Sequence, residues 1–91
     1  MEIKMPYKFY SDSGHGWLAV KRQELIDLNL INRISHYSYQ RGKTVYLEED
    51  CDASLFFQAK GLLSYEMSKE HFIEKHSDRS PIRSYDSFKP I

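Results

Sequence analysis

The chain has 91 residues, of which 41% are hydrophobic and 29% charged, and its thirteen basic and thirteen acidic side chains leave no net charge. This length predicts one domain spanning residues 1–91. The neutral balance argues against a duplex nucleic-acid binder, which carries a positive excess, and against an acidic DNA mimic. The single cysteine excludes an internal disulfide, and no apolar run approaches the ~20 residues of a membrane span, so we expect a soluble cytoplasmic protein.

The first third of the chain predicts a β-hairpin followed by a short helix. Residues 8–10 and 17–21 have the pattern of short strands, and the turn-forming residues 11–16 join them. Apolar residues recur at three- and four-residue spacings over residues 22–28, which predicts a helix. Asn29 accepts the left-handed conformation that ends a helix.

A second hairpin is expected in the middle of the chain. Residues 34–39 alternate between two faces, and residues 45–47 return as the partner strand. Between them, residues 40–43 form a tight turn in which Gly42 can take a positive φ.

The remaining elements are a helix, a strand and a tail. The helix follows an acidic turn, buries Leu55, Phe56 and Ala59, and ends at Gly61. Residues 62–67 are expected to be extended. Residues 68–76 fit a capped helix or a final strand centred on Phe72 and Ile73, and we favour the strand. Residues 77–91 are expected to form an extended tail that packs through Ile82, Tyr85 and Phe88. The predicted fold class is α+β: a small, mainly antiparallel sheet of two hairpins and a fifth strand, with two short helices on one face.

The acidic turn places four carboxylates where strand gives way to helix: Glu48, Glu49, Asp50 and Asp52. Three interpretations stay open. Asp50 or Asp52 caps the helix, because a carboxylate accepts the free N–H groups there. Alternatively, the carboxylates engage basic groups of a partner, or they bind a cation, although the spacing differs from that of a calcium loop.

The first hairpin loop carries Gly14-His15-Gly16-Trp17. Flanking glycines let a backbone approach a ligand closely, which makes His15 a candidate binding residue at the loop tip. Trp17 either belongs to the same candidate site or anchors the core. The four histidines lack the spacing of a zinc site, so no metal and no cofactor are predicted.

Cys51 lies between Asp50 and Asp52. Neighbouring negative charges disfavour its thiolate, whereas a helix N-terminus favours it. No set of acid, base and nucleophile can be named in the sequence, which predicts that the protein is not an enzyme.

The second hairpin combines aromatic and basic residues, because Tyr37, Tyr39, Arg41 and Lys43 follow one another at every second position. Such a surface can stack single-stranded bases and pair with phosphates. It can equally anchor a protein partner, since Tyr and Arg are favoured at interfaces. Ordinary cross-strand packing explains the pattern as well.

A family resemblance extends over residues 9–59. The matching residues are Gly14-His15-Gly16-Trp17-Leu18-Ala19-Val20, Ile34-Ser35, Tyr37-Ser38-Tyr39, Gly42, Tyr46-Leu47-Glu48-Glu49-Asp50-Cys51-Asp52 and Phe56. In these residues the chain resembles a family of small uncharacterised proteins encoded by phages, prophages and plasmids. The resemblance implies an origin in a mobile element and no established catalytic residues.

Two functional hypotheses follow from the sequence. In the first, the protein acts in the host cytoplasm by binding a host protein, as an anti-defence inhibitor of a CRISPR or restriction complex does. The acidic turn then engages Arg and Lys of the target, while Tyr37, Tyr39 and Arg41 supply anchors. In the second, Tyr37, Tyr39, Arg41 and Lys43 bind a single-stranded nucleic acid or a nucleotide.

Overall fold

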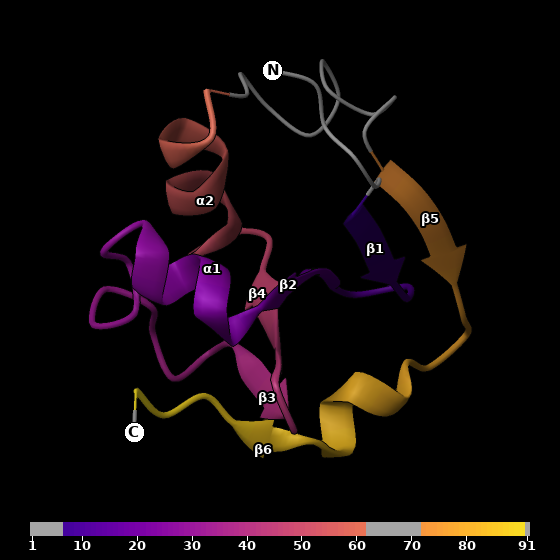
Figure 1. Ribbon diagram of the computed structural model, residues 1–91. Helices are drawn as coiled ribbons and strands as arrows, with labels where there is room; N and C mark the ends of the chain where they lie inside the picture. Colours follow the sequence, from indigo (N-terminus) through magenta and orange to yellow (C-terminus); the bar gives the residue numbers. More distant parts are fainter. Residues whose placement is uncertain (1–6, 62–71, 91) are drawn as a thin grey trace.

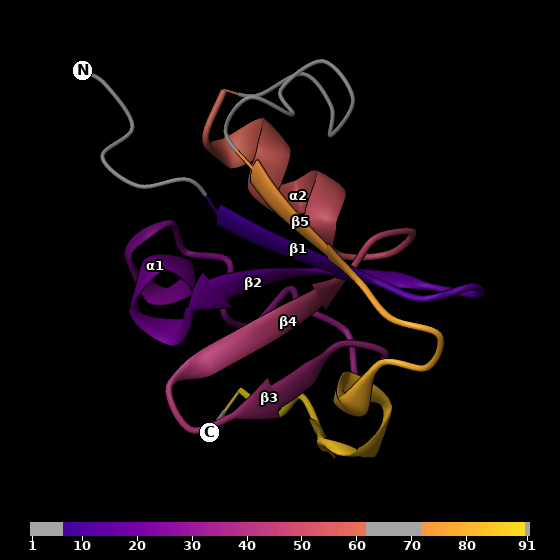
Figure 2. The ribbon, with the colours of Figure 1, turned by 90° about the vertical axis from the view of Figure 1, so that its right-hand side faces the viewer.

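The computed structural model describes residues 7–61 and 72–90. Within these residues the strands are β1 (Tyr7–Ser11), β2 (Gly16–Lys21), β3 (Tyr39–Arg41), β4 (Thr44–Glu48), β5 (Phe72–His76) and β6 (Asp86–Ser87). The helices are α1 (Arg22–Asp27), α2 (Ala53–Ala59) and the 3₁₀ turn η2 (Pro81–Ser84). The strands form one sheet in the order β5-β1-β2-β4-β3-β6, and Figure 2 shows β5, β1, β2, β4 and β3 side by side in this order.

The α+β class is confirmed, but the sheet differs from the expected one in two respects. The described residues supply six strands instead of five, and β5 pairs with β1 in parallel while the other pairs are antiparallel. The C-terminal segment therefore contributes strands at both edges of the sheet, through β5 and β6.

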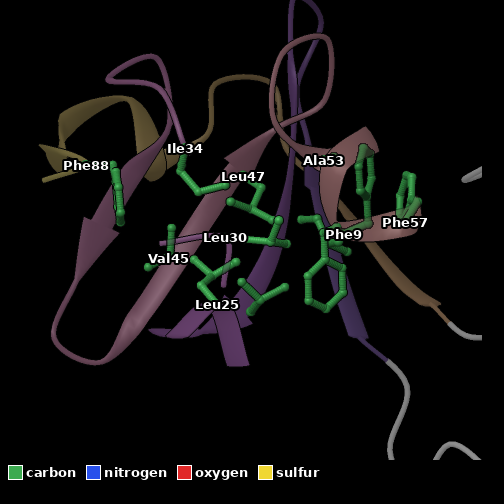
Figure 3. Close-up of a cluster of buried hydrophobic side chains, with 12 residues drawn as sticks. Phe9, Leu25, Leu30, Ile34, Val45, Leu47, Ala53, Phe57 and Phe88 are labelled. Carbon is green, nitrogen blue, oxygen red and sulfur yellow. The ribbon is translucent and has the colours of Figure 1, made fainter. Parts of the chain in front are cut away.

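Strand alternation gives the sheet two sides, and within the described residues both α-helices, α1 and α2, cover the same one (Figure 1). The covered side carries the core, which Figure 3 shows in close-up. Its buried side chains come from the strands, both α-helices and the connecting segments: Phe9, Leu18, Val20, Leu25, Leu30, Ile34, Val45, Leu47, Ala53, Phe56, Phe57 and Phe88. Each short helix is held by this shared burial, because a helix of six or seven residues has little stability of its own.

The first hairpin and the helix after it form as the sequence predicts. The loop closes because the carboxylate of Asp12 accepts hydrogen bonds from the backbone N–H groups of Gly14 and His15, both at 3.0 Å. Helix α1 ends where Asn29 takes a φ of 60°. The chain then turns back, and the N–H of Leu30 donates to the carbonyl of Leu25.

The second hairpin is shorter than predicted. Its turn contains Gly42 at a φ of 60°, as expected, but only Tyr39–Arg41 pair with β4. The predicted strand over residues 34–38 is wrong. Ser35 and Ser38 there donate to the buried carboxylate of Asp52, at 2.7 and 2.5 Å from their hydroxyls, which holds the segment in an irregular course.

The start of α2 also differs from the prediction. Asp52 occupies the N-cap position, but its side chain makes no capping hydrogen bond. Instead, Oε1 of Glu48 accepts from the backbone N–H groups of Asp50 and Cys51 just before the helix. Asp52, which the sequence predicts as a helix cap, thus binds the segment before β3 instead. Glu48 accepts the hydrogen bonds of the turn in its place.

The buried side of α2 agrees in part with the prediction, since Phe56 is buried as expected. Phe56 and Phe57 are buried, Leu55 is half-buried and Ala59 is exposed. The helix ends before Gly61, which takes a φ of 79° as expected.

The C-terminal segment is more regular than the predicted extended tail. The strand expected around Ile73 is confirmed as β5, whereas residues 62–67 and 68–71 lie outside the described residues. Beyond β5, η2 and β6 replace the expected extended course. Ile82 and Phe88 are buried and Tyr85 is half-buried, so this segment packs through the predicted side chains.

Candidate functional site

A cavity of about 320 Å³ opens where the first hairpin loop, the acidic turn and η2 meet. It is lined by His15, Trp17, Tyr37, Tyr39, Glu48, Asp50, Cys51 and Arg83.

The sheet register brings the cavity residues together. Trp17 in β2 lies opposite Glu48 in β4, so the hairpin loop before β2 and the acidic turn after β4 meet at one end of the sheet. The ring of Tyr39 in β3 packs edge-on against Trp17, with centroids 6.2 Å apart. His15 lies over the same indole at 5.9 Å. Aromatic groups therefore form the walls of the cavity.

The carboxylates of the acidic turn crowd one another. Glu48 is 7% exposed, and its Oε2 lies 3.8 Å from Nδ1 of His15. Burial, and then the neighbouring charges of Asp50 and Glu48, raise the pKa of Glu49. The acidic turn therefore concentrates negative charge at this end of the sheet.

The cation in the cavity lining is already paired. Nε and Nη2 of Arg83 donate to the two carboxylate oxygens of Asp12, at 2.5 and 2.9 Å. The guanidinium, followed by backbone N–H groups, holds the pKa of Asp12 well below its usual range. Arg83 also lies over the Trp17 ring, 5.7 Å from its centroid. Since Asp12 compensates the charge of Arg83, the carboxylates of Glu48 and Asp50 determine the sign of the cavity.

Two aromatic residues of the lining leave a group available to a guest: the indole N–H of Trp17 and the exposed ring of Tyr37. Trp17 is 2% exposed, and its indole N–H has no acceptor among the described residues. Tyr37 is 60% exposed at the rim and stacks on His36, with ring centroids 4.6 Å apart. A guest in the cavity could cover the Tyr37 ring.

Cys51 is exposed, but its chemistry is not that of an activated nucleophile. A hydrogen bond with Glu48, then burial and the neighbouring carboxylates, raises the pKa of the thiol. The protonated form is therefore favoured near neutral pH. In the described part of the chain, no three His, Cys, Asp or Glu side chains come together as a metal site.

The structure brings together six residues that the sequence singled out in three separate motifs: His15, Trp17, Tyr37, Tyr39, Glu48 and Asp50. Sequence reasoning missed Arg83, because it lies in a segment expected to be a tail, and nothing local indicates its pairing with Asp12. Cys51, which the sequence does not indicate as a binding residue, is also part of the lining.

Four other candidate residues lie elsewhere. Asp52 is buried and accepts hydrogen bonds from Ser35 and Ser38, which leaves no carboxylate edge at the surface. Glu49 lies against Gly16, where an added methyl group would come within 2.6 Å of its Oε1.

The basic half of the predicted Tyr/Arg surface is separated from its tyrosines. The guanidinium of Arg41 lies over the ring of Tyr85, 5.0 Å from its centroid. Lys43 is exposed in the turn between β3 and β4. Tyr37 and Tyr39 line the cavity instead, so the hairpin does not present one continuous surface.

Comparison with known protein families, with curated proteins and with solved structures gives no match. The site is therefore interpreted from its own geometry. Over the residues that the structure describes, no helix has the length and apolar character needed to cross a membrane.

Proposed function

We propose that this protein is a non-enzymatic binding protein that takes a basic side chain of a partner protein into the cavity between the hairpin loop and the acidic turn. The observation that carries the proposal is the lining itself. Aromatic rings of Trp17, Tyr37 and Tyr39 face the same space as the carboxylates of Glu48 and Asp50.

The energetics favour a cationic guest. A cation over an aromatic face gains ~0.5–1 kcal/mol when exposed and ~2 kcal/mol when desolvated. The carboxylates of Glu48 and Asp50 add a charge-assisted hydrogen bond to a cationic guest. A cavity of about 320 Å³ lies at the lower end of the ~300–1,000 Å³ range of ligand cavities. Its size suits one Arg or Lys side chain better than a larger ligand.

The proposed partner is a host protein. The resemblance of residues 9–59 to proteins of phages, prophages and plasmids supports this choice, because small proteins of mobile elements act on host machinery. Inhibition of a CRISPR or restriction complex is the concrete form of the proposal. Many such complexes bind nucleic acid through exposed Arg and Lys side chains, which are the groups that the cavity fits.

Intrinsic fluorescence tests the cavity directly, because Trp17 is the sole tryptophan of the chain and lines it. We expect N-acetyl-argininamide to change the Trp17 emission in a saturable way, and the neutral citrulline analogue to leave it unchanged. The double variant Glu48→Gln/Asp50→Asn keeps the side-chain shapes and removes both charges, so it should lose the response. Asp27→Asn, at an exposed site on α1, is the matched control. An equal response to the citrulline analogue would refute the cationic guest.

The partner is then sought in host lysate with the whole chain as bait. A protein that stays bound after nuclease treatment, and that is lost with Glu48→Gln/Asp50→Asn but not with Asp27→Asn, supports the proposal. A protein captured equally by the charge-neutral variant binds elsewhere and contradicts the role of the cavity.

A further inference from the structure

The side of the sheet that faces away from α1 and α2 carries a second surface. It adjoins the cavity, because Tyr10 lies opposite Trp17 and Tyr46 lies opposite Tyr39. Strand pairing places side chains of neighbouring strands on this side in rows, and Tyr85 joins them from the segment after η2. We call this surface the open face and define it by Lys8, Tyr10, Ala19, Lys21, Arg41, Thr44, Tyr46, Ile73, Lys75 and Tyr85. Figure 2 views the molecule from this side.

Three tyrosines form the centre of the open face. The ring centroids of Tyr10 and Tyr46 are 5.9 Å apart, and those of Tyr46 and Tyr85 are 5.2 Å apart. Tyr10 and Tyr46 belong to β1 and β4, on either side of β2, where Tyr10 lies opposite Trp17 and Tyr46 lies opposite Ala19. The small side chain of Ala19 leaves room for the two rings to meet diagonally across β2. All three tyrosines are half-buried, so part of each ring is accessible.

Four exposed cations surround these rings. Lys8 and Lys75 flank Tyr10 on β1 and β5, whereas Lys21 and Arg41 lie on β2 and β3 at the other end of the face. Arg41 packs over the ring of Tyr85.

Two of the three acidic residues in these strands point away from the open face. Glu74 lies opposite the core residue Phe9, and Asp86 lies opposite Gln40, which in turn lies opposite the core residue Val45. Glu48 lies on the same side as Tyr46, but it is buried at the end of the sheet that forms the cavity. A chain without net charge thus concentrates positive charge on the face that also carries the aromatic cluster.

We propose that the open face binds single-stranded nucleic acid. Aromatic rings offer stacking surfaces to bases of any sequence, and cations beside them pair with the phosphates. The exposed apolar side chain of Ile73, next to Lys8, adds a contact for a base or sugar. Single strands fit better than a duplex, since only unpaired bases expose their faces to stacking. This surface adjoins the cavity but consists of other residues, and the proposal does not rest on the proposed protein partner.

Fluorescence anisotropy of the whole protein with labelled 20-nucleotide dT and rU oligomers tests the proposal. With four phosphate contacts, the logarithm of the binding constant should fall with the logarithm of salt at a slope of about −3, or ~50-fold from 50 to 200 mM. The exposed charge variant Arg41→Glu/Lys75→Glu should abolish binding. Tyr46→Ala should weaken it by ~10-fold, whereas Tyr46→Phe keeps the ring and should bind as the wild type does.

The controls separate this surface from the cavity. Glu48→Gln/Asp50→Asn removes negative charge beside the open face, so this variant should bind the oligomers at least as tightly as the wild type does. The two proposals can therefore fail independently. If the wild type fails to bind either oligomer at 50 mM salt, binds a duplex equally well, or binds as before after Arg41→Glu/Lys75→Glu, the proposal is overturned. A nuclease-resistant protein partner lost in Arg41→Glu/Lys75→Glu, without oligomer binding, would identify the face as a protein-docking surface instead.

Discussion

The buried carboxylate of Asp52 should contribute a large share of the stability of this fold. The residue is 2% exposed, and its carboxylate accepts from the backbone N–H and hydroxyl of Ser35 and from the hydroxyl of Ser38. Asp52→Ala removes the acceptor of all three donors. Each hydrogen bond to a charged group contributes ~1.5–3 kcal/mol, and each buried donor left unpaired costs ~1–3 kcal/mol.

The expected loss is smaller than the simple sum of these terms. Ser35 is half-buried and can regain water after the substitution, whereas Ser38 is fully buried and cannot. We therefore expect the free energy of unfolding to fall by ~3–5 kcal/mol. That is a large fraction of the ~5–14 kcal/mol that 0.05–0.15 kcal/mol per residue gives for a domain of this length.

Urea unfolding followed by Trp17 fluorescence measures this loss. Asp50→Ala, two residues earlier on the exposed side of the same turn, is the matched control and should change stability by no more than ~0.5 kcal/mol. Asp52→Asn retains one acceptor oxygen and should lie between the two. A loss below ~1 kcal/mol in Asp52→Ala, at an unchanged dependence on urea, would refute this account of the hydrogen bonds.

Two further predictions concern ionisable groups. Arg83 holds the pKa of Asp12 well below its usual range, so the folded protein keeps this carboxylate ionised while the unfolded chain takes up a proton below about pH 4. The stability that Asp12 contributes is present above that pH and is lost as the pH falls. In urea titrations from pH 2 to 7, the free energy of unfolding of Asp12→Asn should therefore fall less steeply at acid pH than that of the wild type. Glu48 raises the pKa of the Cys51 thiol, so at pH 7.5 iodoacetamide should alkylate Cys51 more slowly than it alkylates the free thiol of glutathione. Glu48→Gln should speed the alkylation of Cys51. A thiol that reacts faster than glutathione would contradict the second prediction.

The parts of the fold that local chemistry determines are predictable from the sequence. The first hairpin needs only the turn around Asp12, and the second turn needs only a glycine with positive φ at Gly42. Helix α1 needs its apolar stripe and Asn29 at its end.

The parts that depend on distant residues are not predictable in this way. A capping rule assigns Asp52 to the start of α2, yet Ser35 and Ser38, far earlier in the chain, bind its carboxylate instead. The parallel pairing of β1 with β5 joins residues at opposite ends of the chain, and no periodicity indicates it.

The candidate site shows the same division. The sequence indicated the types of residue that line the cavity, because a glycine-flanked histidine, an acidic turn and a tyrosine-rich hairpin each stand out locally. Their convergence depends on the pairing of Trp17 with Glu48 across β2 and β4, which is a property of the register. Arg83 reaches the site only because Asp12 binds its guanidinium.

The strand order has a consequence for how the chain folds. The four central strands come from residues 7–48, whereas residues 72–87 supply both outer strands. Closing a short loop loses less entropy than closing a long one, so the central strands should assemble first and the outer strands should join late. During synthesis, the free edges of β1 and β3 stay open to pairing with other chains until that segment has left the ribosome.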